Sequence, residues 1–196
     1  MPSHTAAVRP DPRAPWVIDT RDLGRRPGSM RTYHRDIPLL AGIGIDVVGI
    51  SAGEQLSLDV RLESVMEGVL VSCTASALLT GQCARCLDPL EDRLEVGLIE
   101  LFAYPDTVTE SSTDPDEISR VVDGLVDLEP MVRDAVLLAL PQAPVCSEDC
   151  LGLCPECGEK RAELGADHRH ETMDPRKAAL ETKLKQRLRE SEEENE

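Results

Sequence analysis

The spacing of the cysteines constrains this sequence more than any other feature. Six of its seven cysteines fall into two distant groups, Cys83-x2-Cys86 and Cys146-x3-Cys150-x3-Cys154-x2-Cys157. A Cys-x-x-Cys turn brings its two sulfurs about one tetrahedral edge apart, and Cys-x3-Cys is also a usual ligand spacing. Gly158, directly after the last cysteine, accepts the positive φ that closes such a turn. The pattern predicts a zinc site, or two zinc sites, built mainly from cysteines.

The grouping of the ligands is open, because six thiols are more than one tetrahedral ion needs. One zinc could take the four cysteines of the second group and leave the first pair free. Alternatively, one long-range site takes Cys83, Cys86, Cys146 and Cys150, and a second site takes Cys154, Cys157, His168 and His170. We favour the long-range site, because closing a loop of about 60 residues gains the most loop-closure entropy. Cys73, on the inward side of an expected strand, is predicted to be a small buried residue.

Other chemistry of the thiols fits the sequence less well. A reactive Cys-x-x-Cys normally begins a helix, whose dipole lowers the thiol pKa, whereas Cys83 lies between two expected strands. A thiol oxidoreductase is therefore the less favoured alternative. A zinc site dominated by thiolates is closed and structural, and the sequence holds no P-loop, nucleophile elbow, dinucleotide fingerprint or His-Glu-x-x-His motif. We predict that the protein is not an enzyme and takes no small-molecule substrate.

The hydrophobic periodicity predicts an α+β fold. Apolar residues alternate over 56–62, 69–79 and 90–104, which indicates three strands in an antiparallel meander or a partly closed barrel. Asp127 is the expected N-cap of one packed helix that ends at Pro141. Its predicted apolar face consists of Leu128, Met131, Val132, Ala135, Leu138 and Ala139. A last helix is expected from about residue 174 to residue 189.

The expected organisation has four parts. These are a disordered arm (1–15), an α+β domain (16–145) with an acidic loop at about 105–119, a Cys/His zinc-binding segment (146–172), and a C-terminal helix with an acidic tail (173–196). No apolar run approaches the length of a membrane span, and the N-terminus lacks the apolar segment of a signal peptide. We therefore expect a cytoplasmic protein without membrane contact, in a compartment where thiols stay reduced.

Charge is distributed unevenly along the chain. The net charge of −16 argues against a simple electrostatic nucleic-acid binder. Yet residues 1–35 contain seven arginines against three aspartates, whereas the acidic residues concentrate from Asp88 to Glu129 and at the C-terminus. A polyanion could therefore meet the arginine-rich region while the acidic segment faces elsewhere.

Three sequence blocks in a fixed order resemble a known family. The blocks are Cys83-Ala-Arg-Cys86-Leu87, Asp127-Leu-Glu-Pro-Met with Leu138-Ala-Leu-Pro141, and Asp149-Cys-Leu-Gly-Leu-Cys-Pro-Glu-Cys-Gly158. With Asp174-Pro-Arg176, they resemble the YceD family over roughly residues 16 to 188. Members of this family are named large ribosomal RNA subunit accumulation proteins. In the family the position of His168-Arg-His170 often reads Cys-x-Cys, which favours these histidines as metal ligands.

The resemblance implies a non-enzymatic role in the accumulation or processing of large-subunit ribosomal RNA. The implied partner is the large-subunit precursor, through its 23S rRNA or a basic ribosomal protein. RNA contact is then expected at phosphates and should weaken with salt, through Arg21, Arg25, Arg26, Arg31 and Arg35. An aromatic stacking platform is not expected, because the sequence has only four Trp, Tyr and Phe residues. The alternative is a zinc-stabilised adaptor that binds proteins and never touches RNA.

Overall fold

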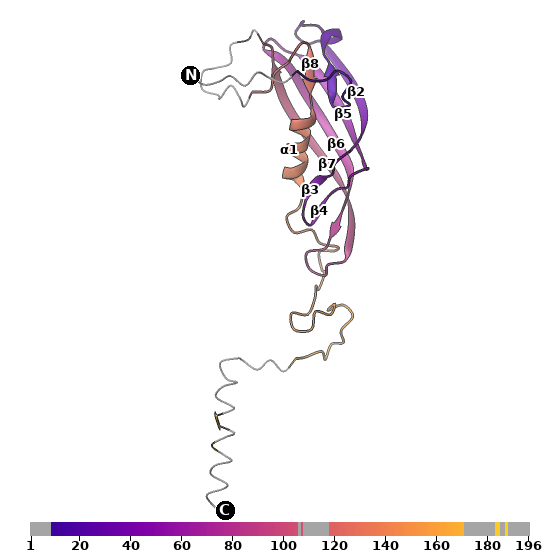
Figure 1. Ribbon diagram of the computed structural model, residues 1–196, viewed down its shortest axis with the longest axis vertical. Coiled ribbons are helices and arrows are strands. Elements are labelled where there is room, and N and C mark those ends of the chain that lie inside the picture. Colours follow the sequence, from indigo (N-terminus) through magenta and orange to yellow (C-terminus); the bar gives the residue numbers. More distant parts are fainter. Residues whose placement is uncertain (1–8, 106, 108–117, 171–182, 185–186, 188–196) are drawn as a thin grey trace, which may run out of the picture. The chain divides into compact units, whose positions relative to one another are not determined.

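The computed structural model describes residues 9–105, 107, 118–170, 183–184 and 187. The chain divides into two compact units, Met1–Cys150 and Leu151–Glu196. The first unit contains an antiparallel sheet and one α-helix, which lies along one face of the sheet (Figure 1). The division falls inside the expected zinc-binding segment 146–172, so each unit holds part of the second cysteine group.

The centre of the sheet is formed by β5 (Gln55–Ser64), β6 (Gly68–Gln82) and β7 (Pro89–Ala103), each antiparallel to the next. These are the three strands that apolar alternation predicts. Leu58 and Val60 on β5 and Val71 on β6 are almost fully buried, whereas residues between them are partly or fully exposed. The predicted antiparallel sheet with one helix is confirmed.

Three strands that no sequence pattern predicts precede β5. They are β2 (Met30–Pro38), β3 (Ile43–Ile45) and β4 (Val48–Ile50). β2 pairs with β5, and β3 pairs with β4 in a register that continues the β2–β5 pairing. β4 also pairs with the end of β6. No alternation marks β2, because most of its residues are exposed on both faces of the sheet edge.

The prediction of a partly closed barrel is wrong, because the sheet is open. Within the described residues, β6 is the only strand that pairs with β7, and β5 is the only strand that pairs with β2. Helix α1 (Glu129–Ala139) instead packs against β7 and β3. A small separate sheet of β1 (Val17–Asp19) and β8 (Leu125–Asp127) also contributes to the core. The apolar face of the sheet is therefore covered by other elements, and burial of this face does not require closure.

Helix α1 begins one residue later than predicted. Its N-cap is Leu128, and the Asp127 carboxylate accepts a hydrogen bond from the Glu129 N–H at 3.0 Å. The predicted apolar face is corrected at its end: Leu138 is 87% exposed and Ala139 is exposed as well, whereas Val136 is fully buried. Val136 lies one turn after the buried Val132 and extends the same stripe. No helix in the described part of the chain is long and apolar enough to cross a membrane.

Some expectations concern residues that the structure does not describe. These include residues 1–8 of the arm, most of the acidic loop at 105–119, and most of the last helix. Residues 183, 184 and 187, which fall within that predicted helix, are helical.

Candidate metal centres

The first cysteine pair lies in a tight turn between β6 and β7. The Cys83 N–H donates to the Asp88 carbonyl at 2.8 Å, and the Leu87 N–H donates back to the Cys83 carbonyl at 2.9 Å. The Arg85 N–H points at the Cys83 sulfur, 3.4 Å away. Leu87 has a φ of 61°, a left-handed conformation that costs a residue with a Cβ roughly 1–2 kcal/mol. The turn therefore holds Cys83 and Cys86 in a conformation suited to binding one ion.

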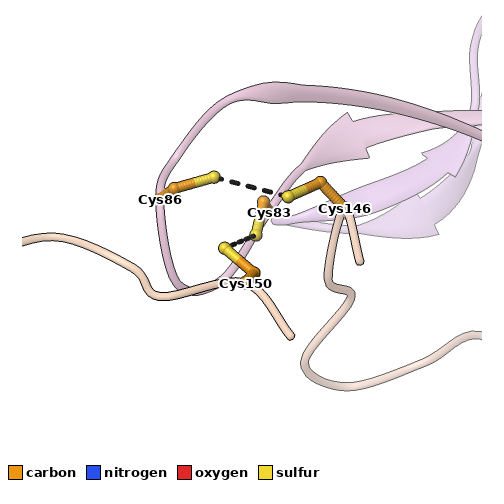
Figure 2. Close-up of side chains that lie close together, drawn as sticks. All are labelled: Cys83, Cys86, Cys146 and Cys150. Carbon is orange, nitrogen blue, oxygen red and sulfur yellow. Dashed lines mark hydrogen bonds between the residues drawn. The ribbon is translucent and has the colours of Figure 1, made fainter. Parts of the chain in front are cut away.

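The segment after α1 brings two more cysteines to this turn. The Ala84 N–H donates to the Pro144 carbonyl at 2.7 Å, which joins the two segments. Four sulfurs lie within 4.8 Å of one another, those of Cys83, Cys86, Cys146 and Cys150 (Figure 2). The Cys83–Cys150 and Cys86–Cys146 sulfur pairs are 3.8 and 3.7 Å apart. A tetrahedral zinc with Zn–S bonds of about 2.3 Å requires sulfur separations of about 3.8 Å, so the four thiols fit this ion.

Arg85 fastens the two segments from outside the sulfur cluster. Its guanidinium donates to the Glu148 and Cys150 carbonyls, each at 3.0 Å. This contact has no signal in the sequence, since its acceptors are backbone carbonyls more than 60 residues away and no side-chain pattern marks them. Arg85 holds the segment that carries Cys146 and Cys150 against the β6–β7 turn.

We expect Arg85→Ala to weaken zinc binding at this centre by 10- to 100-fold, roughly the loss typical of removing a group that orients metal ligands. Competition with a chromophoric chelator measures the affinity. Arg93→Ala, which removes an exposed arginine from β7, is the control and should leave the affinity unchanged. Equal affinities in Arg85→Ala and wild type would show that the two carbonyl contacts do not orient the ligands.

The thiols of this centre differ in acidity. The backbone N–H groups of Cys86, Cys146 and Arg85 lower the pKa of Cys83 to about 6. For Cys86, the Asp88 N–H acts in the same direction, but burial and the neighbouring thiols outweigh it and raise the pKa to about 12. Cys83 is completely buried, unlike the partly exposed cysteines that carry out redox chemistry. A buried thiolate that accepts backbone hydrogen bonds suits a metal ligand better than a nucleophile.

The second unit contains a turn of the same construction. The Cys154 N–H donates to the Glu159 carbonyl at 2.7 Å, and the Gly158 N–H donates back to the Cys154 carbonyl at 2.8 Å. These two bonds repeat those of the β6–β7 turn at the same spacing. Gly158 occupies the position of Leu87 and has a φ of 75°, where glycine avoids the strain of a side chain. The positive φ that the sequence predicts for Gly158 is confirmed.

Two histidines complete a second group of ligands within the second unit. The donor atoms of Cys154, Cys157, His168 and His170 lie within 4.8 Å of one another. The Cys157 sulfur is 3.7 Å from His168 Nε2, which is 2.8 Å from His170 Nε2. Zinc with Zn–N bonds of about 2.05 Å separates two nitrogens by about 3.3 Å, so ion binding would move the imidazoles about half an ångström apart. The N–H groups of Cys157 and Glu156, together with His168, lower the pKa of Cys154 to about 6.

The seventh cysteine belongs to neither group. Cys73 is 4% exposed within the core formed by β5 and β6, as predicted. Burial raises the pKa of its thiol to about 11, so it stays protonated and unreactive at neutral pH.

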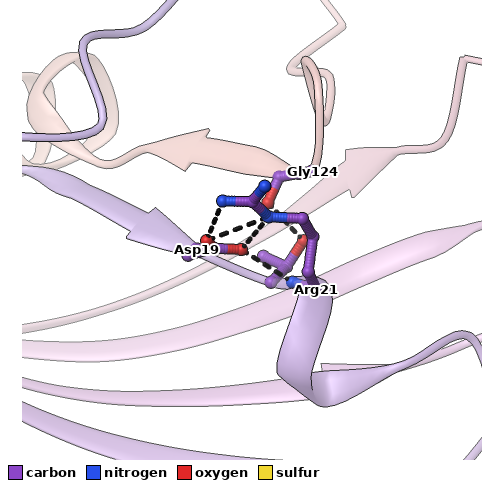
Figure 3. Close-up of polar contacts among 4 residues, drawn as sticks. Asp19, Arg21 and Gly124 are labelled. Atoms are coloured by element: carbon purple, nitrogen blue, oxygen red, sulfur yellow. Dashed lines mark hydrogen bonds and ion pairs between the residues drawn. The ribbon is translucent and has the colours of Figure 1, made fainter.

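The five predicted RNA-binding arginines lie in different surroundings. Arg21 is bound to the Asp19 carboxylate, and its side chain covers Gly124 (Figure 3). The Arg25 guanidinium lies 4.4 Å from the ring centroid of Tyr104. Both arginines line a cavity of about 400 Å³. Arg26, Arg31 and Arg35 make no ion pair with any described residue, and the last two lie on β2.

The fold and the two ligand groups define a class of protein. Its first unit has an open antiparallel sheet with one helix, its second unit is a small Cys/His unit, and two sets of side chains could hold metal ions. The family model described as "Large ribosomal RNA subunit accumulation protein YceD" matches residues 71–185. The chain belongs to the YceD family.

Three relatives illustrate how far the similarity extends. Uncharacterized protein Rv2926c of Mycobacterium tuberculosis is 50% identical over 167 residues, which cover 85% of this chain and 80% of that protein. Uncharacterized protein ML1660 of Mycobacterium leprae is 43% identical over 83% of this chain and 74% of its own length. Uncharacterized protein YlbN of Bacillus subtilis is 31% identical over 58% of this chain and 64% of its own length. No solved structure matches the chain.

Proposed function

We propose that this protein is a non-enzymatic zinc protein that binds precursors of the large ribosomal subunit and supports the accumulation of their RNA. The family description supports the link to large-subunit ribosomal RNA. The observation that carries the zinc assignment is the approach of four sulfurs, from segments about 60 residues apart, to distances that a tetrahedral zinc requires.

Both ions have a structural role in this proposal. One zinc is held by Cys83, Cys86, Cys146 and Cys150, and the other by Cys154, Cys157, His168 and His170. Four protein ligands complete the tetrahedral coordination of zinc and leave no position for a substrate or an activated water. The metals would fix the β6–β7 turn to the segment after α1 and give the second unit its conformation.

The proposed contact with the precursor is made by the arginines of residues 21–35 on RNA phosphates. An interaction of this kind weakens as salt rises, because bound cations are released from the RNA. The adaptor alternative, in which acidic residues bind a basic ribosomal protein, predicts that binding does not depend on these arginines.

Co-sedimentation of the purified protein with large-subunit precursor particles tests the proposal. We expect the wild-type protein to sediment with the particles at low salt. Replacing Arg21, Arg25, Arg26, Arg31 and Arg35 with glutamate should abolish sedimentation with the particles. Binding that survives these replacements would favour the adaptor alternative. If the wild-type protein is absent from the particle fraction at every salt concentration, both the RNA-contact proposal and the adaptor alternative are contradicted.

A further inference from the structure

Strand β2 separates its charged side chains by face. Successive strand residues point to opposite faces of a sheet, so Arg31, Tyr33 and Arg35 share one face, while His34 and Asp36 lie on the other. The register places the first three opposite Leu62, Val60 and Leu58 of β5, all of which are buried. The two arginines thus lie on the core-facing side of the sheet, yet they are exposed at its edge. We call Arg31, Tyr33 and Arg35 the β2 stripe.

The cationic charge of the β2 stripe is not neutralised by nearby acids. On the opposite face, Arg61 pairs with Glu63 at 3.2 Å and His34 with Asp59 at 2.9 Å. The cross-strand neighbours of the stripe are apolar instead, and within the described part of the chain neither Arg31 nor Arg35 makes an ion pair. Two exposed guanidinium groups without carboxylate partners attract an anionic ligand.

Tyr33 adds one stacking ring between the two arginines, although the four aromatic residues of the sequence are too few for an extended stacking platform. The other large aromatics, Trp16, Phe102 and Tyr104, are at most 9% exposed, whereas Tyr33 is half-buried. Its ring packs against the core, and the Arg35 guanidinium lies 5.8 Å from the ring centroid. A ring that the core holds in place, with part of its surface exposed, can stack on a nucleobase, and guanidinium planes can do the same.

We propose that the β2 stripe binds single-stranded RNA, with Arg31 and Arg35 on phosphates and Tyr33 on a base. This inference rests on the proposed function, which supplies ribosomal RNA as the ligand. Single strands are favoured over duplexes because stacking requires a base that is free of its neighbours. Moreover, the major groove of an RNA duplex is too deep and narrow for side chains to read.

Fluorescence anisotropy with the full-length, zinc-loaded protein tests the inference. The probes are a labelled single-stranded oligouridylate of about 12 nucleotides and an RNA duplex of equal length, each titrated at several salt concentrations. We expect tighter binding of the single strand. Arg31→Ala/Arg35→Ala should reduce the slope of log K against log salt by about 1.4, since each phosphate contact on a single strand contributes about 0.7.

Tyr33 should affect affinity without affecting the salt dependence. Tyr33→Leu is expected to weaken binding roughly tenfold with an unchanged slope, whereas Tyr33→Phe keeps the ring and should bind like wild type. Arg93→Ala is the matched control, because it removes an exposed arginine from the other face of the sheet. Circular dichroism and zinc content establish that each variant is folded.

Four outcomes would overturn the inference: preference for the duplex, equal losses in Arg31→Ala/Arg35→Ala and Arg93→Ala, equal losses in Tyr33→Leu and Tyr33→Phe, or an unchanged salt slope in Arg31→Ala/Arg35→Ala. If one of these occurs while the wild-type protein still sediments with large-subunit precursors, the proposed function stands and only the β2 stripe is excluded. If the anisotropy results contradict the inference and the wild-type protein also fails to sediment with large-subunit precursors, both proposals are rejected.

Discussion

The Cys83→Ser/Cys86→Ser variant should contain one zinc ion fewer than wild type and should unfold at a lower temperature. The two sulfurs supply half of the ligands of the long-range centre, and a serine hydroxyl replaces a zinc-bound thiolate poorly. Metal binding to the folded state alone stabilises that state, by about 4 kcal/mol when free zinc is 1,000 times Kd. Mass spectrometry under native conditions measures the zinc content, and thermal unfolding measures the stability.

Cys73→Ala provides the control for loss of a buried thiol. Cys73 lies in the core outside both ligand groups, so this variant should keep all its zinc and lose only about 1 kcal/mol. Cys150→Ser should reproduce the effect of the double variant, because it removes a ligand from the other segment. Full zinc retention in Cys83→Ser/Cys86→Ser would place every metal ligand within residues 146–170.

Removal of metal should unfold the described part of the second unit completely while the sheet stays folded. Within residues 151–170, only Gly152 and Cys154 are buried, and the only strand-like pairing is the bridge between Leu153 and Lys160. A segment with so little apolar burial needs a metal to hold a defined conformation. Two-dimensional NMR should show that the amide signals of 151–170 lose their dispersion on addition of a chelator, whereas those of β5 and β6 keep theirs.

A histidine variant separates the second centre from the first. His168→Ala/His170→Ala should show the same collapse of signals with zinc present, and it should retain one zinc ion. His34→Ala removes an exposed histidine from β2 and should leave both the dispersion and the zinc content unchanged. Well-dispersed signals from 151–170 in the chelated wild-type protein would mean that local hydrogen bonds alone determine this conformation.

Strands were predictable where burial follows the alternation of the sequence. β5, β6 and β7 each carry apolar residues on one face, and this pattern requires no knowledge of neighbouring strands. β2 was missed because an edge strand with exposed arginines on its core-facing side has no such pattern. Closure of the sheet was wrongly predicted because the periodicity of three strands does not reveal what covers their buried face.

The composition of the candidate metal centres was predictable from ligand spacing, and the grouping that loop-closure entropy favoured is the one that the structure brings together. Ligand spacing identifies Cys-x-x-Cys turns, yet it does not determine which pair meets Cys146 and Cys150. The tertiary fold makes that choice, by bringing Pro144 to within hydrogen-bonding distance of Ala84. Arg85 could not have been identified from the sequence, because its carbonyl acceptors become neighbours only after folding.

The ligands of the long-range centre are synthesised at different times, which sets when zinc can bind to all of them. Cys83 and Cys86 are made together with the strands of the sheet, but Cys146 and Cys150 follow about 60 residues later, after α1. A nascent chain folds from its N-terminus as it is made, so the sheet can form while half of the cluster is still missing. Zinc capture by all four thiols would therefore mark a first unit that has been synthesised to its last residue.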